Sequence, residues 1–214
     1  MANLYATGNT NERAQCHKIA KSCASYLERA GLQVKCTYND DMYARCKESD
    51  EFKADMHLAI HTNATAKHNV TGGTQILLYD LQGERKRAGQ AVLDRLAPLT
   101  PGKSAERLIA KPDFYECRAV KGLTVYVEAE FHDTKEGSDF IINNTTRIGE
   151  AIAMGVCDYY DVKLPEEAKK TNASAEAKTL YTVQTGAFTV KKNAEAHLKA
   201  LKKAGFEGII KKSD

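Results

Sequence analysis

Apolar residues recur at helical spacing in several stretches of the chain. Between Asn11 and Gly31, the residues Ile19, Cys23 and Leu27 fall three or four positions from an apolar neighbour, which places them on one helix face. A glycine at position 31 is typical of a helix C-cap. The same period predicts helices over residues 11–31, 40–51, 84–99, 137–160 and 193–204.

Short apolar or alternating runs lie between these helices and predict strands. They cover residues 32–38, 55–61, 74–79, 123–131, 180–188 and 208–212. Two further segments, 104–110 and 115–118, stay ambiguous between helix and strand. Apolar runs between helical patterns are typical of buried strands. The fold class predicted is therefore α/β, with a twisted, mostly parallel sheet flanked by helices.

A change of composition divides the chain. Residues 165–178 are mostly Ala, Glu, Lys, Thr and Asn, with almost nothing apolar, which is typical of a linker. We therefore expect a first domain over 1–162, a linker over 163–179 and a small unit over 180–214. A unit shorter than about 40 residues rarely holds a core by itself, so this last unit is predicted to be partial.

Composition excludes some functions. The 214 residues include 31 Lys+Arg and 28 Asp+Glu, a net charge of +3, and basic residues do not alternate with aromatic ones. This pattern disfavours nucleic acid as a partner. No apolar stretch is long enough to cross a membrane, and the first residues lack a signal-peptide pattern. We therefore expect a chain made in the cytoplasm that leaves by lysis, a non-classical route or a missing leader. Six scattered cysteines are expected to be reduced thiols.

Three features stand apart from packing. His61 ends the strand predicted over 55–61 and Asn63 follows it, and ligands in α/β sheets lie beyond the carboxyl ends of strands. Glu128 lies within the apolar strand 123–131, where a carboxylate is costly to bury unless it is paired. Glu12 begins the first helix. Simpler interpretations remain for each: a hydrogen-bonded strand-end histidine, an outward-facing acid, and an acid favoured by the helix dipole.

Alternation along the strand 123–131 gathers these chemical groups on one face. Val125, Val127, Ala129 and Phe131 are predicted on one side, and Tyr126, Glu128, Glu130 and His132 on the other. Zinc takes His and carboxylate ligands, and a neighbouring carboxylate can act as general base on its bound water. Glu12, His61 and Glu128 fit these roles if the sheet brings them together.

With these residues, the sequence resembles the zinc-dependent N-acetylmuramoyl-L-alanine amidases of the Amidase_3 type, which cut peptidoglycan. The matching pieces are Asn11-Glu12, Leu58-Ala-Ile-His61-Thr-Asn-Ala64, Val70-Thr-Gly-Gly-Thr-Gln-Ile and Val127-Glu128-Ala-Glu-Phe131. The resemblance, over about residues 3 to 162, implies that Glu12 and His61 bind Zn²⁺ and that Glu128 is the catalytic base. Asn63 in the same motif is the candidate substrate-binding residue.

The chain departs from the family at one zinc ligand. The family begins with a strand that ends in a His-Gly-Gly motif, and this sequence begins after the place of that strand. Three histidines are candidates for the remaining ligand, and His132 is the first choice because it follows Glu128 on the same predicted face. His57 shares the face of His61 but lies about 13 Å along the strand, and His17 lies off the face of Glu12. Water is the other alternative.

The tail resembles the opening half of a SPOR domain, a peptidoglycan-binding module, as a partial βαβ unit. The matching pieces are Leu180-Tyr-Thr-Val-Gln-Thr-Gly-Ala-Phe188, Asn193-Ala-Glu-Ala-His-Leu and Lys203-Ala-Gly-Phe206. The amidase resemblance of the first domain implies hydrolysis of the amide between N-acetylmuramic acid and L-alanine in the bacterial cell wall. A non-catalytic wall-binding protein and an inactive fragment are the alternatives. The oligomeric state is left open.

Overall fold

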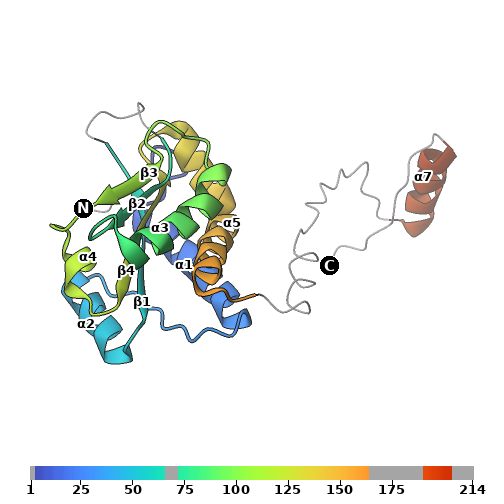
Figure 1. Ribbon diagram of the computed structural model, residues 1–214. Helices are drawn as coiled ribbons and strands as arrows, with labels where there is room; N and C mark the ends of the chain where they lie inside the picture. Colours follow the sequence, from blue (N-terminus) through green and yellow to red (C-terminus); the bar gives the residue numbers. More distant parts are fainter. Residues whose placement is uncertain (1–2, 66–71, 164–189, 204–214) are drawn as a thin grey trace. The chain divides into compact units, whose positions relative to one another are not determined.

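The computed structural model describes residues 3–65, 72–163 and 190–203 (Figure 1). The chain divides into two compact units, residues 1–170 and 171–214. The first unit is an α/β domain, as the sequence predicts. In the second unit, the helix predicted over 193–204 is present as α7, Lys191–Lys203. The tail strands predicted over 180–188 and 208–212 lie outside the described residues.

A four-stranded sheet forms the centre of the first unit, in the order β1-β4-β2-β3. Its strands are β1 (Met56–Asn63), β2 (Gln75–Leu78), β3 (Arg107–Ala110) and β4 (Leu123–Phe131). The pairs β1–β4 and β2–β3 are parallel, whereas β2–β4 is antiparallel. Two of the three pairings are parallel, which confirms a mostly parallel sheet. The ambiguous segment 104–110 contains β3.

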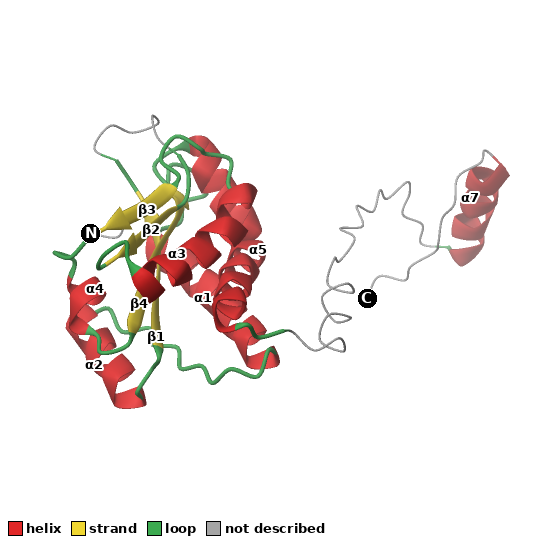
Figure 2. Cartoon of the chain, viewed as in Figure 1, coloured by secondary structure: helices red, strands yellow, loops and turns green. Residues whose placement is uncertain are grey.

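Helices cover both faces of this sheet (Figure 2). On one face lie α1 (Glu12–Arg29), α3 (Gly83–Leu96), followed by the 3₁₀ turn η1 (Ala97–Leu99), and α5 (Lys135–Tyr160). On the other face lie α2 (Met42–Phe52) and the short α4 (Tyr115–Ala119), which resolves the second ambiguous segment as helix. The apolar core fills the space between the sheet and the first group of helices.

The first helix forms where its sequence signals predict. The side chain of Asn11 caps it by accepting a hydrogen bond of 2.9 Å from the backbone N–H of Ala14. Gly31 follows the helix with φ of +86°, a left-handed conformation that glycine adopts without strain. The predicted apolar face is buried in the core at Ile19, Cys23 and Leu27. Burial of this face fixes the helix, and with it the position of Glu12 at the helix N-terminus.

The long helix α5 packs closely against α1. A Cβ added to Gly149 would lie 2.5 Å from the backbone oxygen of Ile19, so glycine is what allows the two backbones to approach this closely. The buried positions Ile141, Ile148 and Ile152 confirm the face predicted from the sequence. At Asn144 the backbone leaves helical geometry (φ −129°, ψ 21°), so α5 is kinked there.

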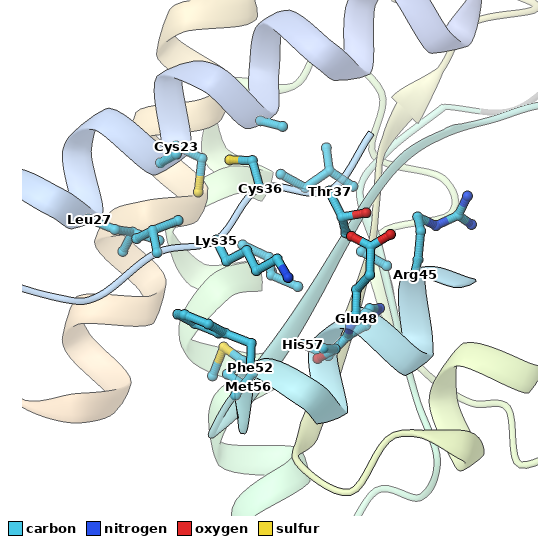
Figure 3. Close-up of a pocket in the computed structure, with 18 of the residues that line it drawn as sticks. Cys23, Leu27, Lys35, Cys36, Thr37, Arg45, Glu48, Phe52, Met56 and His57 are labelled. Carbon is cyan, nitrogen blue, oxygen red and sulfur yellow. The ribbon is translucent and has the colours of Figure 1, made fainter. Parts of the chain in front are cut away.

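The strand predicted over residues 32–38 is wrong. This segment is extended but irregular, and no backbone hydrogen bond joins residues 33–38 to another described residue. Leu32 and Val34 still pack on the core, so the alternation sets side-chain direction without a strand being formed. The reason is the absence of a neighbour at hydrogen-bonding distance. Instead, a groove of about 750 Å³ separates residues 31–40 from β1, which is an edge strand (Figure 3).

A bulge in β4 modifies the alternation predicted for this strand. His61 pairs with Glu128, but Asn63 pairs with Phe131, so two residues of β4 between these pairs oppose one residue of β1. Glu130, which falls in the bulge, is 1% exposed. Its carboxylate accepts hydrogen bonds from the backbone N–H groups of Gly73 at 2.6 Å and Gly102 at 3.0 Å. Glu130 therefore anchors two glycine-containing loops to the end of β4.

The described residues are consistent with two simpler expectations. All six cysteines are free, and five of them are buried, which fits reduced thiols. Within the described part of the chain, no helix is both long and apolar enough to cross a membrane.

Candidate active site

The candidate site lies at the carboxyl ends of the parallel strands β1 and β4. Their register places His61 directly beside Glu128, because the two strands run in the same direction. The third predicted residue, Glu12, arrives from the N-terminus of α1. Topology therefore brings together three groups that lie far apart in the sequence.

Glu12 and His61 are in direct contact. The Oε1 atom of Glu12 lies 3.0 Å from the Nδ1 atom of His61 and also accepts a hydrogen bond of 3.2 Å from the backbone N–H of Thr62. Its Oε2 atom accepts a 2.5 Å hydrogen bond from the side chain of Asn3. Although burial raises the pKa of Glu12, the hydrogen bonds from His61 and Asn3 outweigh it and lower the pKa to about 2. Glu12 is therefore a carboxylate at neutral pH.

The imidazole of His61 is held on several sides. The ring of Tyr126 stacks on it, with centroids 4.5 Å apart and an interplanar angle of 3°. Burial lowers the pKa of His61, but the hydrogen bond to Glu12 and the charges of Glu128 and Glu116 outweigh it and raise the pKa. The ring can rotate little without losing this stacking contact.

One oxygen of the Glu128 carboxylate lacks a hydrogen-bond partner among the described residues. Its Oε2 atom is buried and makes no hydrogen bond within the described residues. Burial, with a further contribution from the charge of Glu12, raises the pKa of Glu128 to about 7, against the opposing effect of His61. A carboxylate in this setting exchanges a proton near neutral pH, which is the property required of a general base.

A network of charged side chains that the sequence did not predict lies on the other side of His61. Glu116, on α4, is buried, and Arg45 of α2 binds both of its carboxylate oxygens, at 3.1 Å (Nε–Oε1) and 3.2 Å (Nη2–Oε2). The Nε2 atom of His57 lies 3.5 Å from Oε1, and the Nε2 atom of His61 lies 4.0 Å from Oε2. The sequence held one sign of this network: His57 lies four residues before His61 on the same face of the strand. The carboxylate of Glu116 thus lies between the imidazoles of His57 and His61.

Three side chains of the kinds that bind metal ions lie close together within this network. The ligand atoms of Cys46, His57 and Glu116 all lie within 4.8 Å of one another. The guanidinium of Arg45 already neutralises the carboxylate of Glu116, and a second cation beside it would be repelled. The donor set next to it differs: among the described residues no Lys or Arg pairs with Glu12, and one oxygen of Glu128 makes no hydrogen bond. By charge alone, a cation is therefore opposed less at the Glu12–His61 pair than at this cluster.

Two further predicted residues are engaged elsewhere. The Nδ1 atom of His132 is 2.9 Å from the hydroxyl of Thr62, and its ring stacks on Tyr5 with centroids 4.8 Å apart. His132 is thus connected to Glu12 through Thr62, whose backbone N–H donates to Glu12 and whose hydroxyl contacts His132. Asn63 donates a 3.0 Å hydrogen bond from its side chain to Gln75 of β2.

The site opens into the groove beside β1. Glu12, His61 and Glu116 line this groove, together with residues 31–40. The aliphatic and sulfur-bearing side chains of Leu27, Cys23 and Met56 lie toward one end, and polar Glu48 and Arg45 toward the other. The site is thus reachable from outside along the open edge of the sheet.

The chain is similar to known proteins in sequence and in fold. Residues 3–158 match the model of the family described as N-acetylmuramoyl-L-alanine amidase, and residues 164–212 match that of the SPOR domain. No curated protein matches the chain. Among solved structures, the amidase AmiC2 of Nostoc punctiforme is 21% identical, with a TM-score of 0.66, covering 75% of this chain and 90% of that one.

Two clostridial structures are similar at the same level. An N-acetylmuramoyl-L-alanine amidase from Clostridium difficile 630 is 22% identical, with a TM-score of 0.63, covering 73% of this chain and 87% of that one. The catalytic domain of the CD27L endolysin targeting Clostridia difficile is 21% identical, with a TM-score of 0.59 and coverages of 70% and 84%. At these identities the similarity shows a shared fold.

Proposed function

The chain belongs to the family of N-acetylmuramoyl-L-alanine amidases, and on this premise we propose that Glu12 and His61 bind zinc and that Glu128 is its general base. Its substrate is the amide bond between N-acetylmuramic acid and L-alanine in peptidoglycan. The observation that carries the assignment concerns Glu128, which pairs with His61 across the two strands. Its Oε2 atom is buried and makes no hydrogen bond among the described residues. A carboxylate without a role would be costly at such a position.

Zinc fits the donors that the site offers. His nitrogen and carboxylate oxygen are common zinc ligands, and Nδ1 of His61 lies 3.0 Å from Oε1 of Glu12. When bound, zinc would supply Lewis acidity toward the scissile carbonyl and toward a water molecule. The backbone N–H of Thr62 and the side chain of Asn3 hold the carboxylate of Glu12 in place. His132 remains a proposed further ligand, and it would have to bind through Nε2 because Nδ1 contacts Thr62.

Glu128 moves the proton in this proposal. Its carboxylate takes a proton from the attacking water and returns it to the leaving amine of L-alanine, as a general base and then a general acid. A pKa of about 7 suits both steps, because neither protonation state is strongly disfavoured at neutral pH. Asn63, held by Gln75, is the proposed polar contact for the substrate.

The tail supplies a proposed wall-binding function. The match of residues 164–212 to the SPOR domain supports peptidoglycan as its ligand. Attachment of a binding module to a hydrolase raises the local concentration of substrate at the site. This function is separable from catalysis, because the two units are compact by themselves.

The first experiment measures free alanine amino termini released from purified bacterial cell walls. Purified protein is assayed with added zinc, with a chelator, and as the variant Glu128→Gln. The matched control is Glu136→Gln, which removes an exposed carboxylate of α5. We expect release with zinc for the wild type and the control, and loss with the chelator and in Glu128→Gln.

Two outcomes would contradict the proposal. Release that persists in the chelator would remove zinc from the mechanism, and near-normal release by Glu128→Gln would remove Glu128. If no release occurs but the protein sediments with the walls, the chain is a binding protein, which was the alternative suggested by the sequence.

A further inference from the structure

The imidazole of His61 lies between two carboxylates. Oε1 of Glu12 is 3.0 Å from Nδ1, and Oε2 of Glu116 is 4.0 Å from Nε2. The two ring nitrogens therefore face acids that come from different helices, α1 and α4. Glu12 has a role in the proposed zinc site, whereas no role has yet been given to Glu116.

Glu116 is held more rigidly than a surface acid would be. It is 3% exposed, and Arg45 binds its two oxygens in a bidentate pair. His57 contacts the oxygen that lies away from His61, at 3.5 Å. The backbone oxygen of Glu116 also accepts a 2.9 Å hydrogen bond from the hydroxyl of Thr124 on β4. Both the side chain and the backbone are therefore fixed with respect to the sheet that carries His61.

A histidine that binds a metal through one nitrogen carries its proton on the other. An acceptor at that second nitrogen fixes the tautomer and the ring orientation, and its loss commonly lowers metal affinity. If Glu12 and His61 hold zinc together, the metal would take the lone pair of Nδ1, and the ring proton would then be at Nε2. The group that faces Nε2 is Glu116.

We propose that Glu116 is a positioning residue that orients His61 for zinc through the N–H at Nε2. This inference rests on the proposed function of Glu12 and His61. In the absence of metal, the N–H at Nδ1 donates to Glu12, and the gap of 4.0 Å leaves Nε2 without a direct hydrogen bond to Glu116. With zinc bound at Nδ1, the ring proton would be on Nε2, facing the fixed carboxylate of Glu116. The stacked ring of Tyr126 would keep the imidazole in its plane.

The alternative explanation is purely structural. Arg45 and Glu116 join α2 to α4, so their ion pair could stabilise this side of the sheet without affecting His61. The two explanations differ in zinc affinity and in the tautomer of His61, which a structural ion pair would leave unchanged. Thermal stability alone does not separate them.

The test compares zinc affinity in Glu116→Gln, the wild type and Glu48→Gln by titration against a competing chelator. Glu48 lines the same groove and contacts Asn39, so its variant removes a nearby charge without touching His61. We expect about 10- to 100-fold weaker zinc binding in Glu116→Gln and unchanged binding in Glu48→Gln. Folded Glu116→Gln with wild-type zinc affinity would overturn the proposal.

A second measurement needs no variant of Glu116. Nitrogen NMR of the ¹⁵N-histidine-labelled wild type reports the tautomer of His61, with the signal assigned by its absence in His61→Ala. We expect a proton at Nδ1 without zinc and at Nε2 with zinc, and a zinc-loaded ring protonated at Nδ1 would overturn the proposal. If the wild type binds no zinc, the proposed function fails together with this inference. If it binds zinc but Glu116→Gln is unaffected, only the role of Glu116 fails.

Discussion

Oε1 of Glu12 lies 3.0 Å from Nδ1 of His61, although 49 residues separate them in the chain. The contact depends on the packing of α1 against α5 and on the position of β1 at the edge of the sheet. It places an ionised carboxylate against an imidazole at the carboxyl end of a strand. Four predictions follow from this arrangement and from the residues around it.

Replacement of His61 by alanine should remove zinc and activity together. His61 supplies the imidazole of the proposed metal pair, so the loss should exceed the roughly 10- to 100-fold drop in affinity that loss of an outer-shell partner causes. Metal content after dialysis and release of alanine amino termini are the two measurements. His17→Ala is the control, because His17 packs on Tyr38 instead. Full zinc content in His61→Ala would show that His61 is a strand-end residue without a metal.

Glu128→Gln should keep zinc and lose activity. The amide retains the size of the side chain but cannot accept the proton from water, and general-base catalysis contributes a factor on the order of 100 to 10,000. Turnover should fall by at least about 100-fold while bound zinc remains at the wild-type level. Glu136→Gln again serves as the control. A parallel loss of zinc would mean that Glu128 belongs to the metal site itself.

The same variant should stabilise the metal-free protein at alkaline pH. Burial raises the pKa of Glu128 from 4.5 to about 7, so the folded state holds this proton more tightly than the unfolded state does. The contribution of Glu128 to stability is therefore fully present below pH 4.5 and is lost as the pH rises toward 7. At one pKa unit per 1.36 kcal/mol, the loss amounts to at most about 3 kcal/mol.

Urea unfolding in the presence of a chelator, at pH 5 and pH 8, measures this effect. The free energy of unfolding of Glu128→Gln should exceed that of the wild type by more at pH 8 than at pH 5. Groups far from Glu128 titrate equally in both proteins, so the difference reports Glu128 together with its effect on the pKa of His61. A gap between the two proteins that does not change with pH would mean that Glu128 is ionised without cost.

Gly149→Ala should separate α1 from α5. The new Cβ would lie 2.5 Å from the backbone oxygen of Ile19. A backbone atom within a helix cannot move aside as the end of a flexible side chain could. Overpacking of this kind costs about 1–3 kcal/mol, measurable by urea unfolding. Because Glu12 begins α1, zinc affinity should fall as well. Arg147→Ala, at an exposed position of the same helix, is the control; equal stability of the two variants would contradict the close approach of the helices.

Some features of this protein follow from the sequence alone. The apolar period of Ile19, Cys23 and Leu27 predicted α1 and its buried face, because a helix repeats locally every 3.6 residues. The end of an apolar run likewise located His61 at a strand terminus, and an acid within such a run identified Glu128. These are local properties, so neighbouring residues are sufficient to specify them.

Other features were decided only by the tertiary structure. Residues 32–38 alternate like a strand but form none, because a strand requires a neighbouring backbone and a groove separates this segment from β1. The surroundings of His132 were also decided by the tertiary structure. His132 follows the bulge in β4, and its ring stacks on Tyr5. Arg45 and Glu116 meet because the chain brings α2 and α4 to the same face of the sheet, and no local pattern records a pairing across 71 residues.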